Sequence, residues 1–253
     1  MAGNDEVMPD YGEFAPFYDC MMDDPFTRSA WVVEHIDRYM PEAASLLELG
    51  CGTGSVLAGL RAVPSLTGLD LSPEMLAIAR AKVPAARFIE GDMASFDLGE
   101  QFDTVICVFD TVNHLPDFNH WASFFERVHA HLVQGGLFMF DVNTLGRLRR
   151  LAEGLPLVHD FDGNTLIVCV EPAGDDMSVW DVKVLRDAGG DQAVLCHERI
   201  CELGVELDRI VTALSSHFEL LEKTDPLGGT PNDESERAYF VVRKRRSVVP
   251  VPR

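Results

Sequence analysis

Short apolar runs alternate with helix-like patterns between residues 45 and 143. The apolar runs are bounded by turn or charged residues and predict strands at 45–49, 66–69, 86–90, 102–109 and 137–142. A helix is predicted after the first strand through about Arg61, and another over 118–132, where apolar residues recur at helical spacing and Gly135-Gly136 follow. Ser72-Pro73-Glu74 has the features of a helix start. Such alternation predicts an α/β fold with a doubly wound, mostly parallel sheet.

The pattern changes after the fifth predicted strand. Residues 156–202 are β-prone runs separated by turn signals such as Asp162-Gly163-Asn164, so we predict a small antiparallel insert of three strands. A helix near 204–215 and runs at 217–222 and 238–243 are predicted to complete a seven-stranded main sheet. The predicted organisation is an N-terminal helical lid (1–40), a main domain (41–155 and 203–246) and the β insert (156–202), with frayed ends at 1–10 and 246–253.

Composition restricts the partners of the chain. Asp and Glu number 41 against 21 Lys and Arg, a formal net charge of −20, which repels phosphate backbones and disfavours nucleic acid. No apolar run approaches the roughly 18–20 residues of a membrane span, and the acidic N-terminus lacks the features of a signal peptide. We therefore expect a cytoplasmic protein without a membrane partner. A homodimer is compatible with the sequence. The six cysteines lack paired metal-ligand spacing, so no metal site is expected.

A glycine-rich loop, Gly50-Cys51-Gly52-Thr53-Gly54, follows the first predicted strand. Glycine permits both a sharp turn and close approach of a ligand to the backbone. The dinucleotide fingerprint is G-x-G-x-x-G, whereas the glycines here are spaced G-x-G-x-G. A nicotinamide-dependent reductase stays open as an alternative, because Asp70 would bind an NAD ribose equally well.

The segment Glu48-Leu49-Gly50-Cys51-Gly52-Thr53-Gly54 resembles the E/D-x-G-x-G-x-G motif of class I S-adenosylmethionine (SAM)-dependent methyltransferases. Further elements follow in the order of that family: Leu69-Asp70-Leu71-Ser72 with Glu74-Met75-Leu76, then Gly91-Asp92-Met93, then Phe102-Asp103. Together they cover about residues 45–143. The resemblance implies a Rossmann-like methyltransferase fold with S-adenosyl-L-methionine as cofactor.

The resemblance also implies roles for the matched residues. Asp70 is expected to accept hydrogen bonds from the ribose hydroxyls, and Asp92 from the adenine amine, while Met75 packs against the adenine. The glycine loop would admit the methionine portion, with Glu48 near its ammonium group. The full predicted cofactor site is Tyr18, Glu48, Gly50, Cys51, Gly52, Gly54, Asp70, Leu71, Met75, Asp92, Met93 and Phe109.

The end of the fourth predicted strand should face the transferred methyl group. His114 is the candidate general base there, because its reference pKa of about 6.5 lets it accept a proton near neutrality; a structural histidine is an equal alternative. Tyr11, Asn113 and Asn143 are predicted on the substrate side. Aromatic residues in the segment 11–19 are expected to fold over the cofactor as a lid, with simple core packing as the alternative.

The insert resembles that of small-molecule N-methyltransferases, which include glycine N-methyltransferase and enzymes acting on nucleotide-linked aminosugars in antibiotic biosynthesis. The aminosugar enzymes tend to carry Glu-Pro-Trp-Trp after the fifth strand, whereas this chain has Asp141-Val142-Asn143-Thr144. The Asn/Asp-Pro-Pro-aromatic motif of nucleic-acid amine methyltransferases is absent from the sequence. We expect a small-molecule amine acceptor, with a hydroxyl or carboxylate acceptor as the alternative; a SAM-binding protein without catalysis is the third possibility.

Overall fold

The computed structural model describes residues 12, 14–21, 25–174, 176–189 and 192–245. The predicted frayed ends and Tyr11, a predicted substrate residue, lie outside the described residues. None of the helices in the described ranges is long and apolar enough to cross a membrane.

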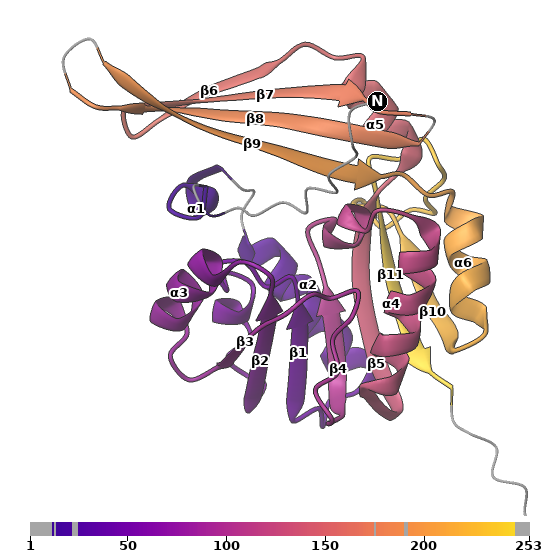
Figure 1. The fold of residues 1–253 in the computed structure, drawn as a ribbon. Helices are drawn as coiled ribbons and strands as arrows, with labels where there is room; N and C mark the ends of the chain where they lie inside the picture. Colours follow the sequence, from indigo (N-terminus) through magenta and orange to yellow (C-terminus); the bar gives the residue numbers. More distant parts are fainter. Residues whose placement is uncertain (1–11, 13, 22–24, 175, 190–191, 246–253) are drawn as a thin grey trace, which may run out of the picture.

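The main sheet has seven strands in the order β10-β11-β5-β4-β1-β2-β3 among the residues described (Figure 1). Its parallel strands are β1 (Ser45–Leu49), β2 (Ser65–Asp70), β3 (Arg87–Glu90), β4 (Phe102–Cys107) and β5 (Leu132–Asn143). β11 (Arg237–Lys244) pairs antiparallel with both β5 and β10 (Phe218–Thr224). The doubly wound, mostly parallel seven-stranded sheet predicted from the sequence is confirmed.

Alternate residues of the central strands enter two separate cores, because side chains of a strand point to opposite faces. On one face, Phe138 and Phe140 of β5 pack against helices α4 (Phe118–Ala130) and α6 (Leu207–Ser215). On the other face, Met139 packs with α2 (Pro25–Tyr39) and α3 (Pro73–Lys82). Thus α2, which falls in the predicted N-terminal lid, forms part of the main core through Val32 and Ile36.

The insert is a separate antiparallel sheet in the order β6-β7-β8-β9. Its strands are β6 (Leu157–Phe161), β7 (Asn164–Pro172), β8 (Met177–Asp187) and β9 (Ala193–Leu203). The prediction of three strands was therefore wrong: β6 is exposed over most of its length, so its sequence lacks the alternation that marks a half-buried strand. The helix α5 (Leu145–Ala152) joins β5 to this sheet, and the short helix α1 (Tyr18–Met21) lies between the two sheets (Figure 1).

Two further local predictions were wrong. After the glycine loop the chain forms only the 3₁₀ helix η1 (Leu57–Gly59), in which the Gly59 amide donates to the carbonyl of Val56. Helix α2 packs directly on this turn: the Ser29 hydroxyl donates to the same carbonyl at 2.9 Å, and a Cβ on Gly59 would lie 2.4 Å from Ser29 Oγ. Gly135-Gly136 lie inside β5 rather than before it. They accommodate a shift in the β4–β5 register, and a Cβ on Gly136 would come within 2.9 Å of the carbonyl oxygen of Asp103.

Candidate active site

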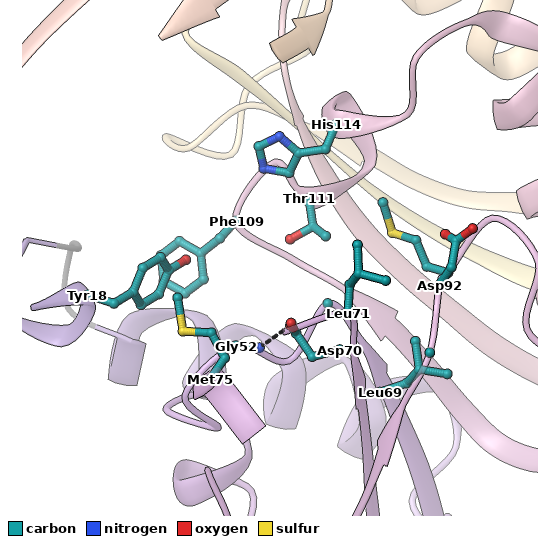
Figure 2. A pocket seen from close by; sticks show the side chains of 13 residues that line it. Tyr18, Gly52, Leu69, Asp70, Leu71, Met75, Asp92, Phe109, Thr111 and His114 are labelled. Atoms are coloured by element: carbon teal, nitrogen blue, oxygen red, sulfur yellow. Dashed lines mark hydrogen bonds between the residues drawn. The ribbon is translucent and has the colours of Figure 1, made fainter. Parts of the chain in front are cut away.

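A pocket opens where β1, β2, β3 and β4 end (Figure 2). This edge of an open α/β sheet is the usual ligand site. Tyr18, Phe109 and Met75 lie on one side of the pocket, with Asp92 on the other and Asp70 at the end of β2. Its complete lining is Tyr18, Gly50, Gly52, Leu69, Asp70, Leu71, Met75, Gly91, Asp92, Met93, Phe109, Thr111 and His114.

The glycine loop brings bare backbone to this pocket. Gly50, Gly52 and Gly54 all have positive φ angles, which glycine adopts at little cost. A Cβ on Gly50 would lie 2.2 Å from Cγ2 of Thr111, so the loop passes too close to the end of β4 for any larger residue. The Gly52 amide donates to Oδ2 of Asp70 at 2.7 Å, which fixes the loop against β2.

Glu48 supplies an unsatisfied acceptor beside the loop. It lines a cavity that adjoins the pocket, together with Gly50, Cys51 and Gly52. Its Oε2 atom is buried and has no hydrogen-bond partner among the residues that the structure describes. Burial, and then the charge of Asp70, raise the pKa of Glu48 well above its usual range. A ligand ammonium group at this point would pair with the carboxylate, so the residues present fit the amino-acid end of SAM.

Asp70 and Asp92 are both held by the backbone that follows their strands. Asp70 Oδ1 accepts from the Ser72 amide at 2.9 Å, and Asp92 Oδ1 accepts from the Ala94 amide at 2.8 Å. Burial raises the pKa of Asp70. A carboxylate has about four acceptor positions, so each side chain keeps capacity for a ligand hydroxyl or amine at the pocket.

Helix α1 covers the glycine loop through a polar cluster. The Asp19 carboxylate accepts from the Thr53 hydroxyl at 2.5 Å and the Ser55 hydroxyl at 2.8 Å. Lys82 of α3 donates to the other oxygen of Asp19 at 2.5 Å. These contacts hold Tyr18, the preceding residue, against the glycine-loop pocket and the adjoining cavity that Glu48 lines.

A larger cavity, called here the second cavity, lies between the main sheet and the insert and contains about 1060 Å³, its open side included. It shares Tyr18, Phe109 and His114 with the first pocket. Asn143 Oδ1 and Trp180 Nε1, from two of its lining residues, are buried and find no hydrogen-bond partner within the described ranges. Its lining is Phe14, Tyr18, Phe109, Asp110, His114, Asn143, Arg147, Leu157, Leu166, Val168, Trp180, Val182, Ile200, Glu202 and Arg237.

His114 ends the 3₁₀ helix η2 (Thr111–His114) and lines both the glycine-loop pocket and the second cavity. Its Nδ1 lies 3.2 Å from the carbonyl oxygen of Cys201, and a carbonyl can only accept, so Nδ1 carries the proton of the neutral ring. Nε2 is then the nitrogen that can take up a proton. Burial lowers the pKa of His114, although Asp110 opposes this effect.

Some predicted residues lie away from the pockets. Gly54 does not line either cavity; a Cβ there would lie 3.2 Å from that of Ala79, so it allows the loop to pack on α3. Asn113 is fully buried, and its amide clamps the backbone: Nδ2 donates to the carbonyls of Asn143 at 3.1 Å and Leu203 at 2.9 Å. Its Oδ1 accepts from the Asn143 amide at 3.0 Å.

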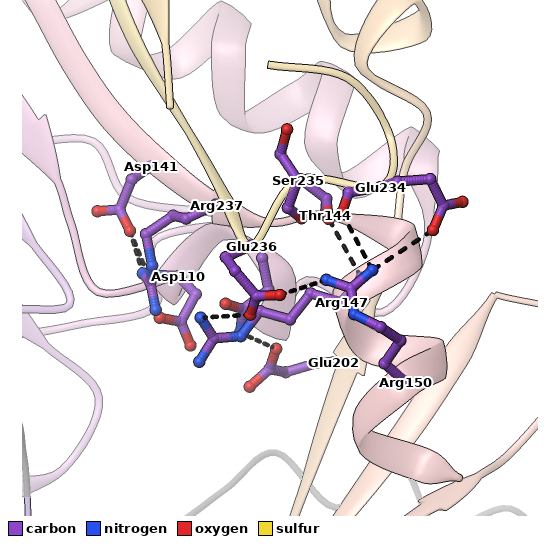
Figure 3. Close-up of polar contacts among 11 residues, drawn as sticks. Asp110, Asp141, Thr144, Arg147, Arg150, Glu202, Glu234, Ser235, Glu236 and Arg237 are labelled. Carbon is purple, nitrogen blue, oxygen red and sulfur yellow. Dashed lines mark hydrogen bonds and ion pairs between the residues drawn. The ribbon is translucent and has the colours of Figure 1, made fainter. Parts of the chain in front are cut away.

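Sequence reasoning missed a buried ionic cluster beside the second cavity. Arg237 lies between Asp141 and Asp110 and forms ion pairs with both (Figure 3). Glu202 lies near them and accepts from Asn143 Nδ2 at 2.8 Å. The sequence could have indicated the two carboxylates, because Asp110 and Asp141 lie near the ends of strands that are adjacent in a doubly wound sheet. It could not have indicated Arg237, which only the pairing of β11 with β5 brings to them.

Comparison with known proteins agrees with this geometry. The methyltransferase domain family matches residues 46–136. "Putative methyltransferase YqeM" of Bacillus subtilis (strain 168) is 30% identical over 94% of this chain and 99% of its own length. The dTDP-3-amino-3,6-dideoxy-alpha-D-glucopyranose N,N-dimethyltransferase of Streptomyces fradiae is 37% identical over 51% of this chain. The match spans only 53%, about half, of that relative.

Solved structures show the same fold. An S-adenosylmethionine-dependent methyltransferase from Clostridium acetobutylicum ATCC 824 has a TM-score of 0.82 and 24% identity, covering 93% of this chain and 99% of its own. The sugar N-methyltransferase KedS8 from Streptoalloteichus sp ATCC 53650 has a TM-score of 0.79 and 26% identity, covering 98% and 97%. These matches are to methyltransferases, so they favour neither of the two alternatives, a nicotinamide-dependent reductase or a SAM-binding protein without catalysis. The chain belongs to the class I SAM-dependent methyltransferases, and its cofactor is S-adenosyl-L-methionine.

Proposed function

We propose that this methyltransferase methylates an amine nitrogen of a small molecule bound between the main sheet and the insert. The observation that carries the proposal is the position of His114, which lines both the glycine-loop pocket and the second cavity. When bound, SAM supplies an electrophilic methyl group on a sulfonium. The protein then has to hold the acceptor nitrogen in line with that methyl group, exclude water and dispose of a proton.

An amine acceptor makes the proton the main chemical problem. An aliphatic amine resembles the lysine side chain, with a reference pKa near 10.4, so only about one molecule in a few thousand is unprotonated at pH 7. The protonated form has no lone pair with which to attack. His114 is suited to take this proton, because burial keeps its ring neutral and the contact of Nδ1 with Cys201 directs the basic nitrogen, Nε2, to the other side of the ring. General-base help of this kind typically contributes about 10²–10⁴-fold.

The relatives support an amine acceptor. The Streptomyces fradiae relative and a Saccharopolyspora spinosa relative, 35% identical over 44% of this chain, are both named as N,N-dimethyltransferases of dTDP-linked aminosugars. KedS8, which aligns over nearly the whole chain, is named as a sugar N-methyltransferase. At the second cavity, an amino group could donate to the unsatisfied Asn143 Oδ1, and an oxygen of a polar ring could accept from Trp180 Nε1.

The test is an acceptor panel in which one ring scaffold carries an amino, a hydroxyl or a carboxyl group. Each compound is incubated with the protein and methyl-labelled SAM, and label in the product is counted and assigned by mass spectrometry. We expect transfer to the amines, with a second methyl on some of them. Transfer only to hydroxyl or carboxyl compounds would refute N-methylation while leaving the methyltransferase activity in place.

A further inference from the structure

We infer that Asp110 binds the acceptor amine in its protonated form, as the cavity-facing member of a buried cluster that carries one surplus negative charge. This cluster, called here the acidic brace, consists of Asp110, Asp141 and Arg237. The inference rests on the proposed N-methylation and deepens it. The acceptor enters as a cation and forms an ion pair with Asp110 before its proton moves to His114.

The backbone at Asp110 is strained in a way that needs support. Phe109 and Asp110 are consecutive non-glycine residues with φ angles of 60° and 53°, a left-handed conformation that costs free energy and that clusters at functional sites. Asp141, which is fully buried, holds this turn: Oδ1 accepts from the Phe109 amide at 2.8 Å and Oδ2 from the Asp110 amide at 3.3 Å. The turn places both Phe109 and Asp110 in the lining of the second cavity.

Charge counting within the acidic brace leaves one negative charge unmatched. Arg237 contacts Asp110 at 2.6 Å and also pairs with Asp141, so one guanidinium serves two carboxylates. Burial favours the neutral form of Asp110, but the Arg237 guanidinium holds its pKa below the usual range, so it is ionised at neutral pH. Among the residues that the structure describes, Asp110 forms an ion pair only with the guanidinium that it shares with Asp141, so it is available to a second cation.

Two other charged residues, Glu202 and Arg147, line the second cavity. Burial, and then the charge of Asp110, raise the pKa of Glu202 well above its usual range, which favours its neutral form. Arg147 forms its ion pair with Glu236, at 3.7 Å, and its charge lowers the pKa of Asp110 less than that of Arg237 does. Figure 3 shows Glu202 and Arg147 beside Asp110. A cationic acceptor would complete the charge balance, whereas a carboxylate would worsen it.

The arrangement also gives the proton a route. Asp110 and His114 line the same cavity, so an ammonium held by Asp110 can pass a proton to Nε2 of His114. The freed nitrogen lone pair then forms the new N–C bond as the methyl–sulfur bond breaks, with its electrons remaining on sulfur. The negative charge of Asp110 stabilises the imidazolium produced, which is why Asp110 raises the pKa of His114 against the effect of burial.

The experiment compares a cation with a neutral molecule of similar shape. Cyclohexylamine, which is protonated at neutral pH, and cyclohexanol are titrated by ligand-observed NMR into the complex of the protein with S-adenosylhomocysteine. We expect the wild-type complex to bind the amine at least tenfold more tightly than the alcohol. Asp110→Asn should weaken amine binding about tenfold or more and leave alcohol binding unchanged. Glu234→Gln is the matched control, because Glu234 pairs with Arg150 outside the second cavity.

Two results would overturn the inference: no preference for the amine in the wild-type complex, or an equal preference in a folded Asp110→Asn variant. The wild-type comparison needs no variant, so it remains decisive if Asp110→Asn does not fold. The acceptor panel separates the two proposals. N-methylation with an unchanged Asp110→Asn preference removes the role of Asp110 alone, whereas methylation of hydroxyls only removes the amine function.

Discussion

Replacing Arg237 by methionine should strongly destabilise the fold. The Arg237 side chain is 8% exposed and contacts Asp141, whose side chain is fully buried, and Asp110, which is 16% exposed. Methionine keeps much of the stem but leaves the buried Asp141 and the largely buried Asp110 without their cation. Breaking a buried pair in this way costs about 3–5 kcal/mol. For a chain of this size that corresponds to a fall in melting temperature of roughly 6–20 °C.

The pH dependence identifies the cause. In the wild type, Arg237 holds the pKa of Asp110 below its unfolded value, so the pair stabilises the fold above that value and the contribution is lost as pH falls. Without Arg237 the pKa of Asp110 should rise, and its protonation in acid should then relieve the repulsion between the two side chains. Urea unfolding at pH 7 and pH 5 should show the gap between variant and wild type narrowing in acid.

The matched control is Arg150→Met. Arg150 pairs with Glu234 and Glu236 at the surface, and its side chain is 43% exposed, so its loss should cost about 1 kcal/mol or less. If Arg237→Met were no more destabilising than Arg150→Met, or if the gap did not change with pH, the account of the acidic brace would be refuted.

Three further outcomes are expected. Asp70→Ala should weaken SAM binding by roughly 1–3 kcal/mol in calorimetry, through loss of hydrogen bonds to the ribose; unchanged affinity in a folded variant would place the cofactor elsewhere. Gly50→Ala should lower both stability and SAM affinity, because the new Cβ would lie 2.2 Å from Cγ2 of Thr111, and adding Thr111→Ser should recover part of the loss; no recovery would contradict the steric explanation. His114→Asn should lower kcat about 10²–10⁴-fold at neutral pH, leave SAM affinity unchanged and recover part of its activity as pH rises. The wild type should stay active below pH 6.5, because the pKa of His114 is lowered. A loss of activity that does not depend on pH would argue for a structural role.

The carboxyl ends of β1, β2 and β3 were predictable because local sequence determines them. Gly50 and Gly52 carry positive φ angles that few other residues accept, and Asp70 and Asp92 bond to backbone amides only two residues away or to the loop itself. Such features leave a direct mark in the sequence. Their assignment to particular atoms of SAM stays a prediction.

The remaining features depend on contacts between distant segments. Residues 55–61 form only the short η1, against which α2 packs through Ser29, and sequence patterns near the loop do not contain that contact. Arg237 reaches Asp110 and Asp141 only through the β11–β5 pairing, across more than ninety residues. Both the acidic brace and the true extent of η1 are therefore tertiary properties.

Asn113 has a consequence for how this fold can diversify. One side chain holds the carbonyl of Asn143, after which the chain leaves the main sheet, and the carbonyl of Leu203, at which it returns. The sixty or so residues between these points, which include all four strands of the insert, begin and end at a single fixed position. A substitution or a change in length between these two points can therefore reshape the second cavity while the two ends of the connection stay fixed to Asn113.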